Sequence, residues 1–266
     1  MKIALAQLSA SRNKQENLDK ALLYIKQAKA QNADLIVFPE VFMALLGPKS
    51  GIIYADMAEA LDGPFVSSLA KAAKENGIHI ICGIFEKSCN DKIRAFNTII
   101  FLNDNGELIH SYRKTHLYDA FSYQESANII AGDNGFEPVK TRFGTIGLLV
   151  CYELRFPEIS RTLALKGADI LIVPTAWVAG PMKEEHLLSI AKARALENTV
   201  YMCVADQVGN IYSGRSVIYN PMGTVLASCG EDEGIIFANI DLEKVKTTRE
   251  KLPCLDQRRP ELYKLD

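Results

Sequence analysis

Residues 32–40 have the sequence NADLIVFPE, and this stretch decides the expected fold. An unbroken apolar run separates Asp34 from Glu40. A short run of this kind is typical of a strand buried on both faces, as in a parallel sheet covered by helices. Residues 167–174, GADILIVP, repeat the pattern, and each stretch follows an amphipathic helix. The repetition indicates two halves related by pseudo-symmetry, although buried strands also converge on such strings through packing alone.

Working outward from this stretch, strand and helix patterns alternate along the chain. The expected strands cover residues 2–8, 34–38, 78–85, 96–102, 108–112, 139–142, 145–150, 169–173 and 200–206, followed by two late strands. The expected helices cover residues 13–31, 64–76, 158–166 and 185–198. Two of the strand pairs flank turn sequences, which indicates hairpins. The mixture of parallel and antiparallel strands predicts an α/β fold with two layered sheets covered by helices.

The chain has 266 residues, of which 48% are hydrophobic. This size predicts one domain over residues 1–266, with enough buried surface for a closed site. Residues 251–266 are rich in charge and contain proline, so we expect a tail on the surface or against a neighbouring subunit.

Charge and hydropathy exclude several partners. Thirty Lys and Arg against 32 Asp and Glu give a net charge of −2, and no segment concentrates the basic residues that a phosphate backbone would require. Residues 1–10, MKIALAQLSA, lack the long apolar core of a signal peptide. No apolar run approaches the roughly 20 residues that span a bilayer. We therefore expect a soluble protein with neither nucleic acid nor membrane as a partner.

The cysteines favour a reducing compartment. Six are spread along the chain without a CxxC pair, namely Cys82, Cys89, Cys151, Cys203, Cys229 and Cys254. This spacing fits reduced thiols better than a disulfide scaffold or a zinc site. The cytoplasm is the expected location, and no metal or other cofactor is expected.

Three polar residues interrupt apolar segments where strands should end: Glu40, Lys114 and Cys151. Ligands of α/β sheets bind at such strand ends. Cys151 also precedes a segment in which Pro157 suits the first turn of a helix, where N–H donors would favour a thiolate. A nucleophile, a proton shuttle and a cation together suit acyl transfer. Taken singly, each could be an ordinary loop acid, surface lysine or buried thiol.

The segments around these residues resemble the three motifs of the nitrilase, or carbon-nitrogen hydrolase, superfamily. They are FPE at 38–40, YRKTHL at 112–117 and CYELRFPE at 151–158, and their order and spacing match as well. The resemblance covers nearly the whole chain. Further similar segments lie at residues 2–7, 193–198 and 220–223.

The resemblance implies a four-layer α-β-β-α sandwich that usually forms dimers. It also implies that Glu40 is the general base, Lys114 the oxyanion stabiliser and Cys151 the nucleophile, with the backbone N–H of Tyr152 as a second oxyanion donor. Glu125 resembles a second glutamate that orients the substrate in many members; an exposed loop acid is the alternative. The implied reaction is hydrolysis of an amide through a thioester.

Within the superfamily, residues 155–158, 174–177 and 180–181 look most like the small-amide branch, which includes omega-amidases and deaminated glutathione amidases. A true nitrilase more often has tryptophan at the position of Tyr152. N-carbamoyl and nitrile substrates stay open as alternatives. Trp177 is expected to line the pocket or to fill the core.

Substrates of that branch carry a carboxylate, for which Lys183, Tyr118, Tyr54 and Arg94 are unranked candidate ligands. One alternative is a Cys-His enzyme in which His116 is the base, although no papain-like or caspase-like signature is present. Another is a protein that binds a metabolite without turnover, since a fold does not prove a function. The sequence leaves the substrate's identity open.

Overall fold

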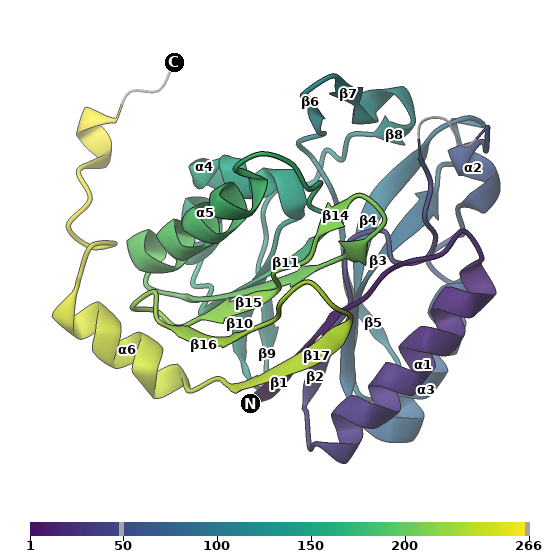
Figure 1. Ribbon diagram of the computed structural model, residues 1–266. Helices are drawn as coiled ribbons and strands as arrows, with labels where there is room; N and C mark the ends of the chain where they lie inside the picture. The colour runs from purple at the N-terminus through teal and green to yellow at the C-terminus, as the bar shows by residue number, and fades with distance from the viewer. Residues whose placement is uncertain (48–50, 264–266) are drawn as a thin grey trace.

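Two mixed sheets form the centre of the molecule in a computed structural model that describes residues 1–47 and 51–263 (Figure 1). The first sheet has the order β17 (Gly234–Asn239), β1 (Lys2–Gln7), β2 (Leu35–Val37), β3 (His79–Lys87), β4 (Ala95–Leu102), β5 (Leu108–Arg113), and β8 (Ile129–Ile130) also pairs with β4. The second has the order β16 (Val225–Ser228), β15 (Val217–Tyr219), β12 (Tyr201–Asp206), β11 (Ile170–Thr175), β10 (Gly144–Leu148), β9 (Val139–Thr141).

Short elements complete the chain. Two small hairpins pair β6 (Asp119–Ala120) with β7 (Tyr123–Gln124), and β13 (Val208–Gly209) with β14 (Tyr212–Ser213). The α-helices are α1 (Lys14–Ala30), α2 (Tyr54–Met57), α3 (Pro64–Asn76), α4 (Pro157–Leu165), α5 (Lys183–Asn198) and α6 (Leu242–Lys251). The 3₁₀ helices are η1 (Glu125–Ala127), η2 (Cys151–Arg155) and η3 (Pro260–Leu262). No helix in the described ranges is long and apolar enough to cross a membrane.

The sheets stack face to face, and each outer face carries helices (Figure 1). Alternation along β1 shows how one strand serves both layers, because successive side chains point to opposite faces. Ile3 and Leu5 pack into the core shared with the second sheet, whereas Ala4 and Ala6 pack into the core beneath α1 and α3. The layers therefore follow the α-β-β-α order, and the expected sandwich is confirmed.

The helix boundaries follow from local sequence. The Asn13 side chain accepts a hydrogen bond from the Gln15 N–H at 2.9 Å and caps α1. Pro64 and Pro157 occupy the first positions of α3 and α4, where a missing N–H costs nothing. Gly77 ends α3 in the left-handed region at φ 56°. These helices match the expected ones to within one or two residues.

The two halves repeat one topology, as the NADLIVFP and GADILIVP strings indicated. Each sheet has three neighbouring parallel strands, β1-β2-β3 and β10-β11-β12, flanked by antiparallel strands on both sides. Asp34 accepts a hydrogen bond from the Lys2 N–H at 2.7 Å, and Asp169 accepts one from the Thr145 N–H at 3.0 Å. Both aspartates thus join their strand to the preceding one.

The C-terminal region differs in part from the expectation. Helix α6, which no expected element covered, begins at an Asp241 cap and buries only Val245 and Thr248. The described part of the tail lies on the surface, as expected, and extends from α6 along one side of the molecule (Figure 1). The expected contact of this tail with another subunit stays a prediction.

Candidate active site

Glu40, Lys114 and Cys151 lie at the same end of the two sheets, following β2, β5 and β10. They share the wall of a cavity of about 380 Å³. All three are buried, with 3%, 2% and 8% of their surface exposed. A cavity of this size suits a small molecule. The structure thus brings together three residues that stand far apart in the sequence.

Close packing of backbone shapes the turn that presents Glu40. The Gly83 N–H of β3 donates to the Pro39 carbonyl at 3.1 Å. A Cβ at Gly83 would lie 2.4 Å from the Val41 nitrogen, so only glycine permits this approach. Val41 itself has a φ of 45°, which is unusual for a β-branched residue. The strained turn directs the Glu40 carboxylate into the cavity.

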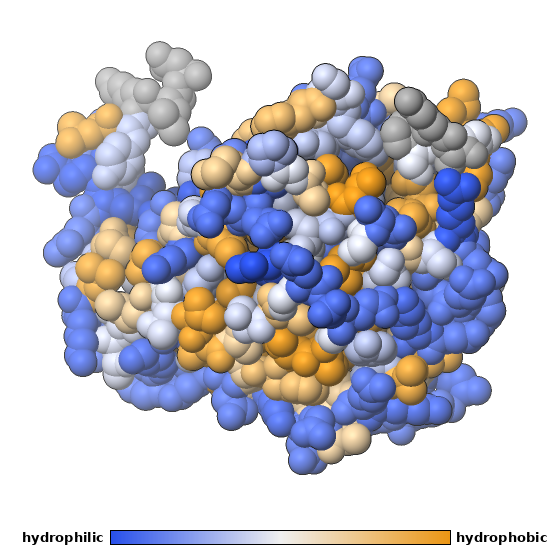
Figure 2. Space-filling model, viewed as in Figure 1, coloured by the Kyte–Doolittle hydropathy of each residue, from blue (hydrophilic) through white to orange (hydrophobic). Residues whose placement is uncertain are grey.

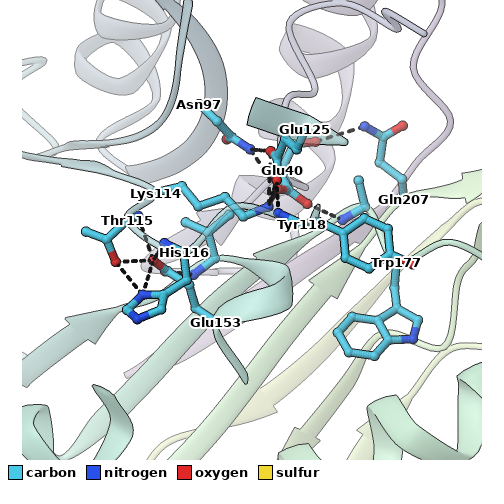
Figure 3. A network of polar contacts seen from close by, with 12 residues as sticks. Glu40, Asn97, Lys114, Thr115, His116, Tyr118, Glu125, Glu153, Trp177 and Gln207 are labelled. Atoms are coloured by element: carbon cyan, nitrogen blue, oxygen red, sulfur yellow. Dashed lines mark hydrogen bonds and ion pairs between the residues drawn. The ribbon is translucent and has the colours of Figure 1, made fainter. Parts of the chain in front are cut away.

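A hydrogen-bond network joins two carboxylates to one ammonium (Figure 3). Lys114 Nζ donates to Glu40 Oε1 and to Glu125 Oε2, both at 2.9 Å. Asn97 Nδ2 donates to Glu40 Oε1 at 2.7 Å and to Glu125 Oε1 at 3.2 Å. The Ala176 N–H donates to Glu40 Oε2 at 2.8 Å. Glu40 therefore accepts bonds from three N–H groups, which fix the position of its carboxyl group in the cavity.

The same carboxylates fix the charge of Lys114. Burial opposes a charged ammonium, but Glu125 and Glu40 outweigh it and raise the pKa of Lys114 well above its ordinary value. Lys114 therefore stays protonated. Glu125 is 7% exposed and lines the cavity, so the alternative of an exposed loop acid is wrong.

Cys151 begins η2 with a φ of 46°, in the left-handed region. Such strain in a non-glycine residue often marks a functional site. Burial and the nearby Glu40 raise the pKa of the Cys151 thiol well above its ordinary value, against the smaller lowering by Lys114 and the Ala176 N–H. The resting group is thus a thiol. A nearby N–H does favour the thiolate, as expected, but burial and Glu40 outweigh it, so the pKa of the thiol rises.

Glu153 fastens the Cys151 turn to the segment that carries Lys114. Its Oε2 accepts from the Val150 N–H at 2.8 Å. Its Oε1 accepts from Tyr112 Oη at 2.8 Å. The same oxygen accepts from the N–H and hydroxyl of Thr115 at 2.8 and 2.7 Å (Figure 3). Burial acts against ionisation, yet hydrogen bonds from His116, Thr115 and Tyr112 lower the pKa of Glu153. Glu153 therefore stays charged and holds both segments in register.

Tyr152 and Trp177 also line the cavity. The Tyr152 ring packs edge-on against Tyr118, with 5.1 Å between centroids. Trp177 Nε1 donates to the Lys183 carbonyl at 2.8 Å, and the ring belongs to the buried core as well. Both expectations for Trp177 are therefore met.

The residues expected to bind a carboxylate of the substrate fall into two groups, those that line the cavity and one that does not. Lys183, Tyr118 and Tyr54 line the cavity. Arg94 does not: it forms an ion pair with Asp91 at 2.8 Å in a surface turn, so that candidate is wrong. Arg155 also lines the cavity, with its guanidinium 4.9 Å from the centre of the Trp177 ring.

The contacts of His116 indicate a structural role. Its Nδ1 lies 2.8 Å from the Thr115 hydroxyl, and its ring packs 4.2 Å from Phe156 between centroids. Of the residues that the structure describes, none of those lining the cavity is a histidine. The Cys-His alternative therefore lacks its base. Within the same residues, no group of three His, Cys, Asp or Glu side chains is arranged to hold a metal ion.

Comparison with known proteins identifies the family. The model for carbon-nitrogen hydrolases matches residues 2–250. The chain belongs to the carbon-nitrogen hydrolase family. A deaminated glutathione amidase of Escherichia coli O157:H7 is 35% identical over 259 residues, which cover 97% of each chain. An omega-amidase of Homo sapiens is 32% identical over 277 residues, covering 100% of this chain and 97% of that one. This carbon-nitrogen hydrolase is an amidase.

Solved structures share the fold of this amidase. The NitFhit protein of C. elegans superposes with a TM-score of 0.91 and 30% identity over 98% of this chain and 66% of that one. An amidase from Nesterenkonia sp. AN1 superposes with a TM-score of 0.84 and 26% identity over 99% and 95%. In that structure, a Glu-to-Gln mutant, the acetamide moiety of fluoroacetamide is attached to the active-site cysteine.

Three residues of the site escaped the expectations from sequence: Asn97, Glu153 and Arg155. Asn97 interrupts the apolar strand β4, which is a weak sign of an inward polar role. Glu153 and Arg155 lie within the cysteine motif, but the sequence does not indicate which residues they contact. Only the fold shows that this amidase uses Glu153 to join two motifs.

Proposed function

We propose that this amidase hydrolyses small omega-carboxamides that carry a carboxylate, and that Cys151, Glu40 and Lys114 perform the chemistry. One observation carries the proposal: a buried ammonium bridges two carboxylates in the wall of the cavity that also contains the Cys151 thiol. This arrangement combines a nucleophile, a base and a cation at a single site.

In the first half-reaction, Glu40 takes the thiol proton as Cys151 Sγ attacks the amide carbon. The raised pKa of the thiol supports this role, because a thiol needs a base at the moment of attack. The carbonyl oxygen becomes an oxyanion. Glu40 then gives the proton to the nitrogen, the carbon–nitrogen bond breaks, and ammonia leaves behind a thioester.

Lys114 is suited to hold the oxyanion. Its ammonium has three donors, which point to Glu40 Oε1 at 2.9 Å and to the two oxygens of Glu125 at 2.9 and 3.2 Å. The longest of these bonds, to Glu125 Oε1, can give way so that this donor reaches the substrate oxygen. The Tyr152 N–H, in the first turn of η2, would supply a second donor. Glu125 keeps Lys114 in position through both of its oxygens.

In the second half-reaction, Glu40 removes a proton from water, which attacks the thioester carbon. The carbon–sulfur bond breaks, the thiolate regains its proton from Glu40, and the carboxylate product leaves. One carboxyl group therefore acts as base and then as acid in each half-reaction, and the acid product releases its own proton to water as the carboxylate.

The substrate class rests on the cavity and on the relatives. The volume of about 380 Å³ suits a small molecule. Arg155 and Lys183 contribute positive charge to its wall, which favours an anionic substrate. The named activities of the relatives, omega-amidase and deaminated glutathione amidase, agree with a small acid that carries an amide.

The test measures ammonia release from omega-carboxamides such as succinamate by the wild type and by Cys151→Ala. We expect turnover by the wild type and complete loss in the variant. Rapid quenching of the wild type followed by mass spectrometry should detect an acyl group on Cys151. Cys203→Ala is the control, because Cys203 is also buried but lies outside the cavity wall. Turnover by Cys151→Ala would contradict the mechanism.

We further propose that the protein is a single-domain cytoplasmic homodimer. All six cysteines are unpaired, which supports a reducing compartment. The tail and α6 expose apolar side chains, among them Leu252 and Leu262, which suits a contact with a second subunit. Hydrophobic residues also gather over β16 and β17 on the face in Figure 2, where Val225 is 50% exposed. Analytical ultracentrifugation and cell fractionation test these two assignments.

A further inference from the structure

Lys183 is the first residue of α5 and one of the few buried lysines, with 8% of its surface exposed. It lines the catalytic cavity together with Tyr118. Its Nζ donates to Tyr118 Oη at 3.1 Å and lies 3.4 Å from the centre of the Phe121 ring. The ammonium is thus surrounded by aromatic groups at the wall of the site.

This cation has no carboxylate partner among the residues that the structure describes. Contacts with aromatic rings compensate only part of the cost of burying a charge. The charged groups that line the cavity are the carboxylates Glu40 and Glu125 and the cations Arg12, Lys114, Arg155 and Lys183, of which Arg12 is exposed. The four cations outnumber the two carboxylates, which leaves the wall with an excess of positive charge.

We propose that Lys183 is a specificity-determining residue that binds the carboxylate of the substrate. The proposal rests on the amidase mechanism above and extends it to the choice of substrate. An omega-amide with one carboxylate would supply the negative charge that the wall lacks. The N-terminus of α5, a helix of 16 residues, adds a favourable field at the same point.

The hairpin β6–β7 links this contact to the catalytic groups. Phe121 and Ser122 form its tight turn, both at positive φ. The Tyr118 N–H donates to Glu125 Oε2 at 2.6 Å, and its hydroxyl accepts from Lys183. One residue therefore touches both the partner of Lys114 and the proposed carboxylate ligand. A substrate of the correct length would contact Lys183 while its amide lies at Cys151.

The test compares succinamate with butyramide, a neutral amide of the same chain length. In Lys183→Gln we expect kcat/KM for succinamate to fall about 10- to 100-fold, mainly through KM, because a charge-assisted hydrogen bond is lost. The value for butyramide should change less than about threefold. Lys183→Met, which keeps an unbranched aliphatic side chain at this position, should behave in the same way, and Lys183→Arg should restore part of the preference.

Lys192→Gln is the matched control, since it removes the same charge from an exposed position of the same helix. Both substrates should be unaffected. Equal losses for both substrates in the Gln and Met variants would assign Lys183 a structural role and overturn the proposal. Unchanged succinamate kinetics, or a wild type that does not prefer succinamate, would also overturn it. Failure of the amidase mechanism would appear separately, as turnover by Cys151→Ala.

Discussion

The cavity wall contains two sets of charged residues, called here the acidic end and the cationic end, which differ in whether the protein supplies their counterions. At the acidic end, Lys114 is 2% exposed and bonded to two carboxylates, Glu40 and Glu125. At the cationic end, Arg155 and Lys183 face the same cavity and have no carboxylate partner within the described residues. Both ends place cations in the same wall, but only the acidic end supplies its own counterions.

This difference separates chemistry from recognition. Charges that the protein pairs in advance are already oriented, so stabilising an oxyanion there requires little reorganisation. A cation without a partner is instead available to an anion that arrives with the substrate. The comparison suggests that the acidic end controls the rate of bond cleavage, whereas the cationic end controls which amide binds.

The largest expected effect comes from removing the cation of the acidic end. Lys114→Met leaves Glu40 and Glu125 buried without their counterion, which should lower the free energy of unfolding by about 3–5 kcal/mol. We expect turnover to fall at least about 100-fold, because the oxyanion loses its cation. The loss of stability should shrink as the pH falls, since the unpaired carboxylates then take up protons. Denaturant unfolding at several pH values measures this.

Lys71→Met is the control for Lys114→Met, because Lys71 is 77% exposed and its contact with Glu75 is long, at 3.7 Å. Its stability should change by less than about 0.5 kcal/mol. Similar losses of stability in Lys114→Met and Lys71→Met would mean that the buried ion pairs of Lys114 contribute no more than an ion pair on the surface.

The second effect concerns Glu40→Gln, which keeps the shape of the side chain but removes its charge. We expect kcat to fall about 10²- to 10⁴-fold, because the proton shuttle is lost. The reactivity of the Cys151 thiol toward an alkylating reagent should rise, although kcat falls. Since Glu40 raises the pKa of Cys151, its removal should shift the alkylation profile of Cys151 to lower pH. A kcat within tenfold of the wild type, or a shift to higher pH, would remove Glu40 from the role of base.

Local patterns were enough to predict most of the sandwich. Strand β2 is visible in the sequence as an apolar run, and the ends of helix α3 are marked by Pro64 and Gly77. Helix α6 was missed because it buries only Val245 and Thr248, so its sequence shows little apolar periodicity. Because few of its residues are buried, few of them need to be apolar, and the helical periodicity of the sequence is weak.

The positions of site residues were predictable where these residues stand at strand ends. Their charge states and contacts were not predictable, because these depend on residues far away in the chain. Glu40 and Cys151 each follow an apolar strand, which the sequence displays directly. The charge state of Cys151 depends on burial beside Glu40, a neighbour far away in the chain. Arg94 was an expected ligand and Arg155 was not, yet only Arg155 lines the cavity, because Arg94 pairs with Asp91, three residues earlier in the chain.

The smallest expected effect tests whether the cationic end is where recognition occurs. Arg94 has the charge that a carboxylate needs, but its side chain is 43% exposed and pairs with Asp91 at 2.8 Å. In Arg94→Gln, KM for succinamate should change within about twofold, because water and salt screen a charge outside the cavity. Steady-state kinetics at low and physiological ionic strength measure this. A selective rise in KM for succinamate over butyramide would place the carboxylate near Arg94 and away from Lys183, and the division of the cavity into two ends would then be wrong.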